Sequence, residues 1–219
     1  MSKEQKPPPE ASARGRLIAL EGREASGKST QARLLAKKLG AVLTREPGGT
    51  ATGKRVRAML LERDARQIDA RTEALFMAAD RTQHVTEVVL PALSSGRWVV
   101  TDRFSASLLA YQGFGRGLDL SELLWLTGWA AHGIWPDLNV LLDVPAEAAA
   151  ARQGRELDRL ESEDAEFHRR VAAGYQALAE ANPATWVVVD GLGSSADVAG
   201  RVLAVVTERL GTPSAAGPG

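Results

Sequence analysis

The sequence has 219 residues, of which 44% are hydrophobic and 25% are charged, proportions that are typical of a globular protein and exclude a disordered or fibrous one. Lysine and arginine together number 27, as do aspartate and glutamate, so no excess charge attracts nucleic acid or a membrane surface. The absence of cysteine excludes disulfides, thiolate metal sites and cysteine nucleophiles, and it favours a cytoplasmic location.

Both ends of the sequence are polar and rich in proline or glycine. Residues 1–15 contain no apolar segment of the kind found in a secretory signal, so we expect a disordered leader there. Residues 211–219 (GTPSAAGPG) are expected to form a flexible tail. No apolar run approaches the length of a membrane span, and no linker divides residues 16–210, which we expect to form one domain.

Short apolar runs typical of buried parallel strands alternate with segments of helical periodicity. The expected strands are 16–21, 41–45, 97–102, 138–144 and 185–190. The expected helices are 28–39, 53–61, 71–93, 120–132, 146–151, about 164–182 and 196–210. Ser194 followed by Asp197 is the pattern of a helix cap before the last of these. The alternation predicts an α/β fold in which a five-stranded parallel sheet carries helices on both faces, giving three layers.

The stretch EGREASGKST (Glu21–Thr30) has the spacing G-x-x-x-x-G-K-S and lies between an expected strand and an expected helix. In that order, a curled glycine-rich backbone and a helix N-terminus direct N–H groups at phosphate oxygens, as in a phosphate-binding loop, or P-loop. Lys28 is expected to reach the β- and γ-phosphates of ATP, and Ser29 to bind Mg²⁺. A glycine turn with a surface lysine is the alternative. The expected ATP-binding residues are Gly22, Arg23, Glu24, Ala25, Ser26, Gly27, Lys28, Ser29 and Thr30.

Further polar residues are expected at the carboxyl edge of the sheet, where open α/β sheets bind ligands. Arg45 lies in TREPGGT after the second strand, and Asp102 and Arg103 follow the third strand in TDRFSASLLAYQGFGRG. Arg81 lies in MAADRTQH on a helix. Each arginine taken alone could be a surface residue, but together they suit an anion that accepts a phosphoryl group.

These motifs, in this order, resemble those of the bacterial thymidylate kinases, which belong to the P-loop nucleoside monophosphate kinases. The resemblance runs from about Arg16 to Leu210 and includes PDLNVLLDVP and RELDRLE; TREPGGT combined with DRF…AYQG is its most specific part. The resemblance implies that the γ-phosphoryl group of ATP moves to dTMP, giving ADP and dTDP in dTTP biosynthesis, with Mg²⁺ as cofactor and a homodimer as the assembly.

The resemblance also implies roles for residues around the acceptor. Arg45, Arg81 and Arg103 match residues that hold the 5′-phosphate and thymine region of dTMP. Glu24 matches an acid near the 3′-hydroxyl group, and Asp102 matches an acid that organises Mg²⁺, substrate or both.

The residues expected near the base and the sugar match the family pattern less closely. Tyr111 matches a ring that packs near the deoxyribose, and Gln112 lies beside the base. Met77 stands where the family usually has an aromatic ring stacked on thymine. Leu108 stands where the family usually has a side chain that bonds the thymine N3 atom. Because of these two departures, a nucleoside monophosphate kinase with a broader or different acceptor range, such as dUMP, is an alternative function.

The segment ARQGRELDRLESED resembles the LID of this family, placed at about 152–160. A mobile arginine that closes over the reacting phosphates stabilises the charge that develops during transfer. Ser26, next to Gly27, is not basic, so we assign this arginine to the LID. We expect Arg152 and Arg155 to be catalytic, together with Lys28 and Arg103, and Arg159 to anchor the hinge. Arg23 is expected to point elsewhere.

A non-catalytic nucleotide-binding relative is the alternative function from another functional class. The helices expected near 71–93 and 120–132 carry surplus apolar surface, including Trp125 and Trp129, which suits a homodimer or a plain core. His84, His132 and His168 show no metal-binding spacing and are interpreted as structural.

Overall fold

The computed structural model describes residues 14–62, 68–152 and 158–213. Five parallel strands form one sheet in the order β2-β3-β1-β4-β5. The strands are β1 (Leu17–Glu21), β2 (Val42–Arg45), β3 (Val99–Asp102), β4 (Leu138–Asp143) and β5 (Trp186–Asp190). Each expected strand is present, with boundaries that differ by at most two residues. The predicted fold class is confirmed.

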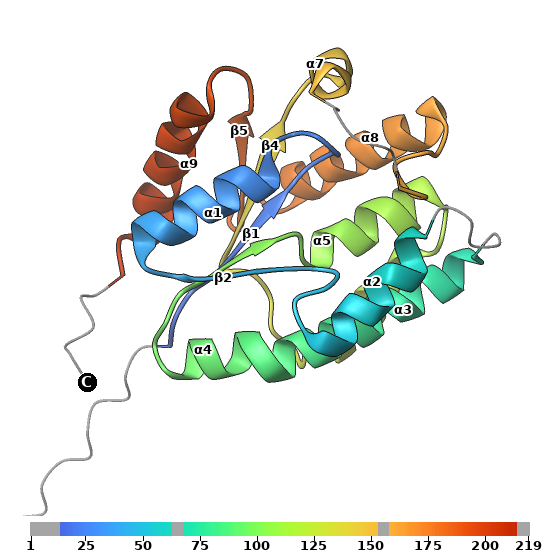
Figure 1. Cartoon of the computed structure of the whole chain (residues 1–219), viewed down its shortest axis with the longest axis horizontal. Coiled ribbons are helices and arrows are strands. Elements are labelled where there is room, and N and C mark those ends of the chain that lie inside the picture. The colour runs from blue at the N-terminus through green and yellow to red at the C-terminus, as the bar shows by residue number, and fades with distance from the viewer. Residues whose placement is uncertain (1–13, 63–67, 153–157, 214–219) are drawn as a thin grey trace, which may run out of the picture.

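Helices cover both faces of this sheet (Figure 1). They are α1 (Lys28–Leu39), α2 (Ala51–Leu61), α3 (Ala70–His84), η1 (Val85–Val89), α4 (Leu90–Ser94), α5 (Ser105–Leu108), η2 (Leu109–Gly115), α6 (Leu120–Ala130), α7 (Ala146–Ala151), α8 (Ala165–Ala181) and α9 (Ser195–Leu210). The predicted cap of the last helix is present, because Ser194 and Asp197 form a capping box. None of the helices in the described ranges has both the length and the apolar character that a membrane crossing requires.

Alternate residues of β1 feed two separate core layers. Ile18 and Leu20 pack with α1 and α9 on one face of the sheet. Leu17 and Ala19 pack with η1 and α4 on the other face. Burial on both faces explains why β1 is an uninterrupted apolar run. Because all five strands join this one sheet, we propose that residues 16–210 form a single domain. The expected leader and tail lie outside the described residues except for 14–15 and 211–213.

The helix expected at 71–93 is continuous but changes its winding. A π-helical stretch, η1, separates α3 from α4, and the N–H of Leu90 reaches back to the carbonyl of Val85. Pro91 has no N–H to donate, and a wider turn before a proline is a common way to accommodate that loss.

Residues 105–115 form α5 and η2, although the sequence analysis assigned no helix there. The YQGFG segment is a poor helix former, since glycine loses backbone entropy. Tertiary packing overrides this preference. A Cβ atom on Gly113 would lie 2.5 Å from Leu120, and one on Gly115 would lie 2.6 Å from Phe167, so both glycines permit close approach of neighbouring elements.

Candidate active site

One cavity of about 590 Å³ opens at the carboxyl edge of β1, β2 and β3. The strand register brings Leu20 and Arg45 beside Asp102, so the segments that follow these strands meet there. The structure brings most of the predicted site residues into this cavity. Those that line it are Glu24, Ala25, Gly27, Lys28, Ser29, Thr30, Arg45, Met77, Arg81, Asp102, Arg103, Tyr111 and Arg152.

The loop between β1 and α1 has a backbone that requires glycine. Gly22 has a φ angle of 137° and Gly27 a φ angle of 95°, and a Cβ atom on Gly22 would lie 2.7 Å from the Leu142 carbonyl oxygen. Gly27 is the N-cap of α1, and no side chain caps that helix. The N–H groups of its first turn therefore have no side-chain acceptor and can bind an anion.

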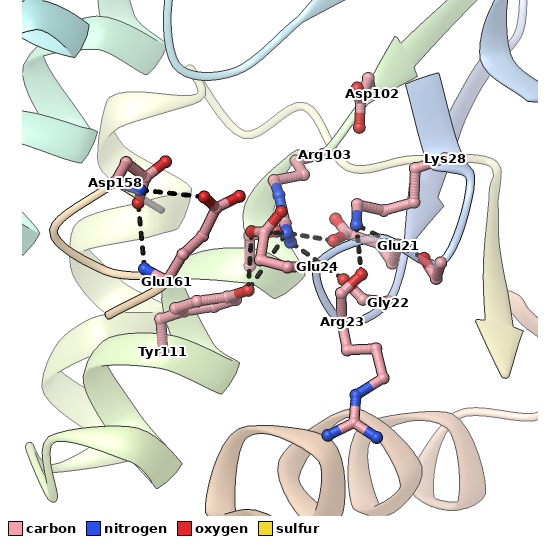
Figure 2. A network of polar contacts seen from close by, with 12 residues as sticks. Glu21, Gly22, Arg23, Glu24, Lys28, Asp102, Arg103, Tyr111, Asp158 and Glu161 are labelled. Atoms are coloured by element: carbon pink, nitrogen blue, oxygen red, sulfur yellow. Dashed lines mark hydrogen bonds and ion pairs between the residues drawn. The ribbon is translucent and has the colours of Figure 1, made fainter. Parts of the chain in front are cut away.

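Lys28 is almost fully buried inside this loop. Its Nζ donates to the Arg23 carbonyl oxygen at 2.6 Å and to Ser26 Oγ at 3.4 Å. Burial, followed by the nearby Arg103 cation, lowers the pKa of Lys28 to about 8. Figure 2 shows the Arg23 guanidinium directed away from Lys28, as the sequence analysis expected, so Arg23 contributes its carbonyl group here.

Ser29 and Asp102 lie side by side at the start of α1 and the end of β3. The Ser29 hydroxyl group donates a hydrogen bond to the Asp102 carboxylate. Within the described ranges, no group of three or more His, Cys, Asp or Glu residues could hold a metal by itself. A divalent cation at this position would therefore need oxygen ligands from a bound nucleotide or water in addition to these two side chains.

Arg103 is held by an extensive network in the centre of the site (Figure 2). Its Nη2 pairs with Glu24 and donates to Tyr111 Oη at 3.1 Å. Its Nη1 donates to the Gly22 carbonyl oxygen at 3.1 Å and to Tyr175 Oη at 2.9 Å. The backbone φ of Arg103 is 70°, a left-handed value that a non-glycine residue adopts only when its surroundings enforce it.

Glu24 remains ionised in this network. Burial alone would raise the pKa of its carboxyl group, but the charges of Arg103 and Lys28 outweigh burial and lower it to about 2. Tyr111 also donates to Glu24 at 3.0 Å. The site therefore presents a fixed negative charge beside two fixed cations.

Glu21 is a site residue that the sequence analysis missed. Its carboxylate is fully buried and accepts hydrogen bonds from the Phe104 N–H at 2.8 Å, from Ser107 Oγ at 2.7 Å and from Tyr175 Oη at 3.2 Å. Burial raises its pKa despite the neighbouring Arg103. The available signal was an acid that closes an otherwise apolar strand, since a buried carboxylate needs partners.

Arg81 presents one free nitrogen at the cavity. Its Nε and Nη2 contact Glu46 Oε2 at 2.9 and 2.8 Å, and Nη2 also donates to the Phe104 carbonyl oxygen at 3.0 Å. Nη1 is buried and has no hydrogen-bond partner among the described atoms. The Arg81 side chain also lines the cavity, so its guanidinium group retains one unused donor nitrogen beside the space open to a ligand.

Arg57 on α2 is a further cation that the sequence analysis missed. It lines the same cavity as Arg45 and donates to the Pro47 carbonyl oxygen at 3.2 Å. Burial, with the adjacent Arg45 charge, lowers its pKa. The sequence shows three basic residues on this helix, namely Lys54, Arg55 and Arg57, and only the packing of α2 shows which one faces the cavity.

Gln112 is fully buried but is absent from the cavity lining. Its Nε2 donates to Glu73 at 3.2 Å, and its Oε1 has no partner among the described atoms. Gly22, Arg23 and Ser26 are likewise outside the lining, although their loop borders the cavity.

The expected LID residues are placed at two different positions. Arg152 lines the cavity, and its Nη2 donates to the Gly191 carbonyl oxygen at 3.0 Å. Arg159 is instead bound to Glu73 at 2.7 Å and to the Leu60 carbonyl oxygen at 2.9 Å, which fastens its segment to α3 and α2. Arg155 lies outside the described residues.

Two acids, Asp158 in the LID and Glu161 just after it, also line the cavity. Asp158 and Glu161 exchange hydrogen bonds through their backbone N–H groups and carboxylates, each at 3.0 Å (Figure 2). The sequence analysis quoted their motif but gave them no role. They add two carboxylates to a cavity wall that also includes Glu24 and Tyr111.

Met77 and Leu108 form an apolar part of the cavity wall. Leu108 is buried, and Met77 is half-buried beside it in the same cluster. A base placed here would meet a thioether and an aliphatic side chain, neither of which donates a hydrogen bond.

Comparisons with known proteins agree with this site. The thymidylate kinase family model matches residues 20–202. A thymidylate kinase of Synechococcus sp. (strain JA-2-3B'a(2-13)) is 48% identical over 198 residues, which cover 88% of this chain and 95% of that protein. A thymidylate kinase of Pelotomaculum thermopropionicum is 46% identical over 185 residues, covering 81% and 86%. A crystal structure of thymidylate kinase from Ehrlichia chaffeensis superposes with a TM-score of 0.75 at 32% identity, covering 88% and 98%. The chain therefore belongs to the thymidylate kinase family.

Proposed function

We propose that this chain transfers the γ-phosphoryl group of ATP to dTMP, producing ADP and dTDP. The observation that carries the proposal is that one cavity contains both the phosphate-binding loop, with Lys28, and the guanidinium groups of Arg45, Arg81 and Arg103. Two anionic nucleotides can therefore meet end to end within it. Family membership favours dTMP over a broader acceptor range and over a non-catalytic relative.

The donor nucleotide occupies the loop side. Backbone N–H groups of residues 22–27 and of the start of α1 hold the ATP phosphates. The Lys28 ammonium group, which donates to the Arg23 carbonyl oxygen within this loop, is the side chain that contacts the β- and γ-phosphates.

The Ser29 hydroxyl group and the Asp102 carboxylate fit a Mg²⁺ ion, because both are hard oxygen ligands and lie within contact of each other. Bound between these two side chains, such an ion would supply positive charge to the β- and γ-phosphates. The two side chains would hold it together with phosphate oxygens and water.

The acceptor phosphate occupies the arginine side. Arg81 Nη1 and the cations Arg45 and Arg57 hold the 5′-phosphate and the base region, while Glu24 and Tyr111 adjoin the sugar. In the reaction, an oxygen of the dTMP phosphate forms a bond to the γ-phosphorus as the bond to the β–γ bridging oxygen breaks, and ADP leaves. No strong general base is required, because the attacking monoester oxygen is already anionic.

We assign separate roles in the transfer step to the arginines near the cavity. Arg103 is fixed between Glu24 and Tyr175, and we assign to it the alignment of the two phosphates. Arg152 lines the cavity and Arg155 lies outside the described residues, and we propose that they stabilise charge on the transferring group. Arg159, bound to Glu73, anchors the hinge.

The base packs against Met77 and Leu108, which line the cavity. Gln112 is fully buried and outside the lining, so we propose that it contributes to the base end indirectly, through its hydrogen bond to Glu73.

A panel of nucleoside monophosphates in a coupled ADP assay tests the proposal. We expect dTMP to give the highest kcat/KM among dTMP, dUMP, dCMP, dGMP and dAMP, each with ATP and Mg²⁺. The proposal fails if dTMP is no better than the other four, or if ADP appears at the same rate without any acceptor.

We further propose a homodimer formed through α3 and α6. Trp125 and Trp129 are 69% and 66% exposed, with stacked rings 6.3 Å apart, and Leu75 on α3 is 59% exposed. A second hollow of about 470 Å³ lies between these helices. Exposed apolar surfaces of this kind usually mark interaction sites. Sedimentation velocity at micromolar concentration should give twice the chain mass.

We also propose that the protein acts in the cytoplasm without nucleic acid.

A further inference from the structure

His84 is a fully buried histidine whose two ring nitrogens are both engaged. It is the last residue of α3 and follows Arg81 by three positions, so both side chains lie on one face of the helix. Its Nδ1 lies 2.8 Å from Glu46 Oε1, and its Nε2 lies 2.6 Å from Thr44 Oγ1. Thr44 belongs to β2 and Glu46 follows that strand, so the ring joins α3 to the carboxyl edge of the sheet.

Glu46 divides its two oxygens between His84 and Arg81. Oε1 contacts the histidine, while Oε2 contacts Arg81 Nε and Nη2. Burial would raise the pKa of Glu46, but Arg81 and the hydrogen bond from His84 outweigh it and lower the pKa. The carboxylate is therefore ionised and can only accept, which assigns a hydrogen to His84 Nδ1.

The contact with His84 determines how the carboxylate of Glu46 is turned. The terminal torsion of a glutamate is broad, so a carboxylate held through one oxygen can rotate. With Oε1 fixed by the histidine, Oε2 stays in line with Arg81 Nε and Nη2. Because a guanidinium group is planar, holding two of its nitrogens fixes the third, and Nη1 is the one left without a partner among the described atoms.

The position of the ring is itself built into the TREPGGT segment. A Cβ atom on Gly49 would lie 2.6 Å from His84 Cδ2 and 2.9 Å from Thr44 Oγ1. Only glycine at this position leaves room for the histidine to reach the threonine. Asp80 is a further charged group beside Glu46. Its Oδ1 accepts from the Gly48 N–H at 2.9 Å, and its charge interacts with those of Glu46, His84 and Arg81.

We infer that His84 is a positioning residue for the acceptor nucleotide, acting through Glu46 to hold the Arg81 guanidinium with Nη1 directed at the bound dTMP. The inference rests on the proposed function for the identity of the acceptor. It goes beyond the interpretation of His84 as a structural histidine, because it predicts a selective effect on one of the two substrates.

Two substitutions of His84 separate positioning from general packing. His84→Leu removes both ring contacts. His84→Asn keeps an N–H near the position of Nδ1 and so retains the donor to Glu46. His132→Asn is the matched control, since His132 is exposed and has a φ angle of 52°, which asparagine adopts readily. Steady-state kinetics for both substrates, dTMP titration calorimetry and thermal unfolding are measured for each variant.

We expect His84→Leu to raise KM and Kd for dTMP about tenfold, which is the loss of affinity expected for a weakened hydrogen bond to a charged group. The KM for ATP should stay within about twofold of wild type. We expect His84→Asn to recover most of this loss and His132→Asn to match wild type. Unchanged dTMP binding in a folded His84→Leu protein would overturn the inference. Equal effects on both substrates, without recovery in His84→Asn, would also overturn it.

Failure of the proposed function is recognised separately. Wild-type protein that does not phosphorylate dTMP refutes the function itself. The link between His84 and Arg81 is then decided without substrate, by urea unfolding of His84→Leu, Arg81→Met and the double variant. Non-additive changes in the free energy of unfolding support the link, and additive changes overturn it.

Discussion

The two halves of the cavity are built in different ways. The donor half comes from one continuous stretch, residues 22–30, in which the backbone and a single lysine provide the expected phosphate contacts. The acceptor half is assembled from side chains on β2, α2, α3, β3 and η2, and buried carboxylates orient its arginines. A backbone site is fixed by local conformation, whereas a side-chain site depends on partners that are distant in sequence.

This difference appears in how the cations are held. Lys28 is bound by the carbonyl group and hydroxyl group of its own loop. Arg103 is bound by Glu24, Tyr111 and Tyr175, which come from three separate elements. Substitutions on the donor half should therefore act on chemistry alone, and those on the acceptor half should also disturb the partners of the substituted residue.

Lys28→Ala tests the donor half and has the largest expected effect. Removing the Lys28 ammonium group should lower kcat at least a hundredfold, the order found when one preorganised charge-stabilising donor is lost. Thermal unfolding should change little, because the hydrogen bonds of Lys28 are made within its own loop. A coupled ADP assay measures the expected fall in kcat, and calorimetry measures the thermal unfolding. Activity within tenfold of wild type would contradict the assignment.

The pH dependence of activity should also distinguish the donor half of the cavity from the acceptor half. Burial lowers the pKa of Lys28 to about 8, so the free protein loses this positive charge as pH rises above that value. The charged groups that face Lys28 are Glu21, Glu24, Asp102 and Arg103. We expect kcat/KM for ATP, which reports the free enzyme, to fall about tenfold per pH unit above 8.

The acceptor half should contribute no such loss from Glu24, whose pKa of about 2 keeps it ionised across the assay range. For stability the sign is opposite to that of ATP binding. Between pH 8 and 10.5 the unfolded chain holds a proton at this lysine that the folded chain has released, so this group makes the fold more stable as pH rises. A flat profile of kcat/KM for ATP up to pH 9.5 would show that Lys28 is not the group involved.

Leu108→Ser tests the base end of the acceptor half and has the smallest expected effect. Leu108 is buried and lines the cavity, so a hydroxyl group there would meet the base edge. One new hydrogen bond, of about 1–1.5 kcal/mol, should raise kcat/KM for dTMP up to about tenfold over the wild type. Leu109→Ser, a neighbouring substitution outside the lining, is the control. An equal change in both variants would place the base elsewhere.

Sequence patterns predicted the fold because the strands and most of the helices had a local signature. The strands were apolar runs, and the last helix had its Ser194 and Asp197 cap. The segment 105–115 was missed because its glycines are poor helix formers and are accommodated by packing, Gly113 against Leu120 and Gly115 against Phe167. Local propensity gives no indication of such contacts.

Motifs predicted the residues that line the cavity better than they predicted the buried carboxylates behind them. Lys28, Arg81 and Arg103 were identified and lie in one cavity. Glu46, which orients Arg81, and Glu21, which binds Ser107 and Tyr175, were not assigned a role. A buried carboxylate acts through whichever groups the tertiary fold brings to it, and spacing along the chain does not reveal those partners.

The central claim is that two nucleotides occupy the two halves of one cavity at the same time. A single molecule in which adenosine and thymidine are joined through five phosphates tests it directly by steady-state inhibition. We predict that this molecule is competitive with both ATP and dTMP and binds once per chain. Competition with only one substrate, or two molecules bound per chain, would contradict the claim.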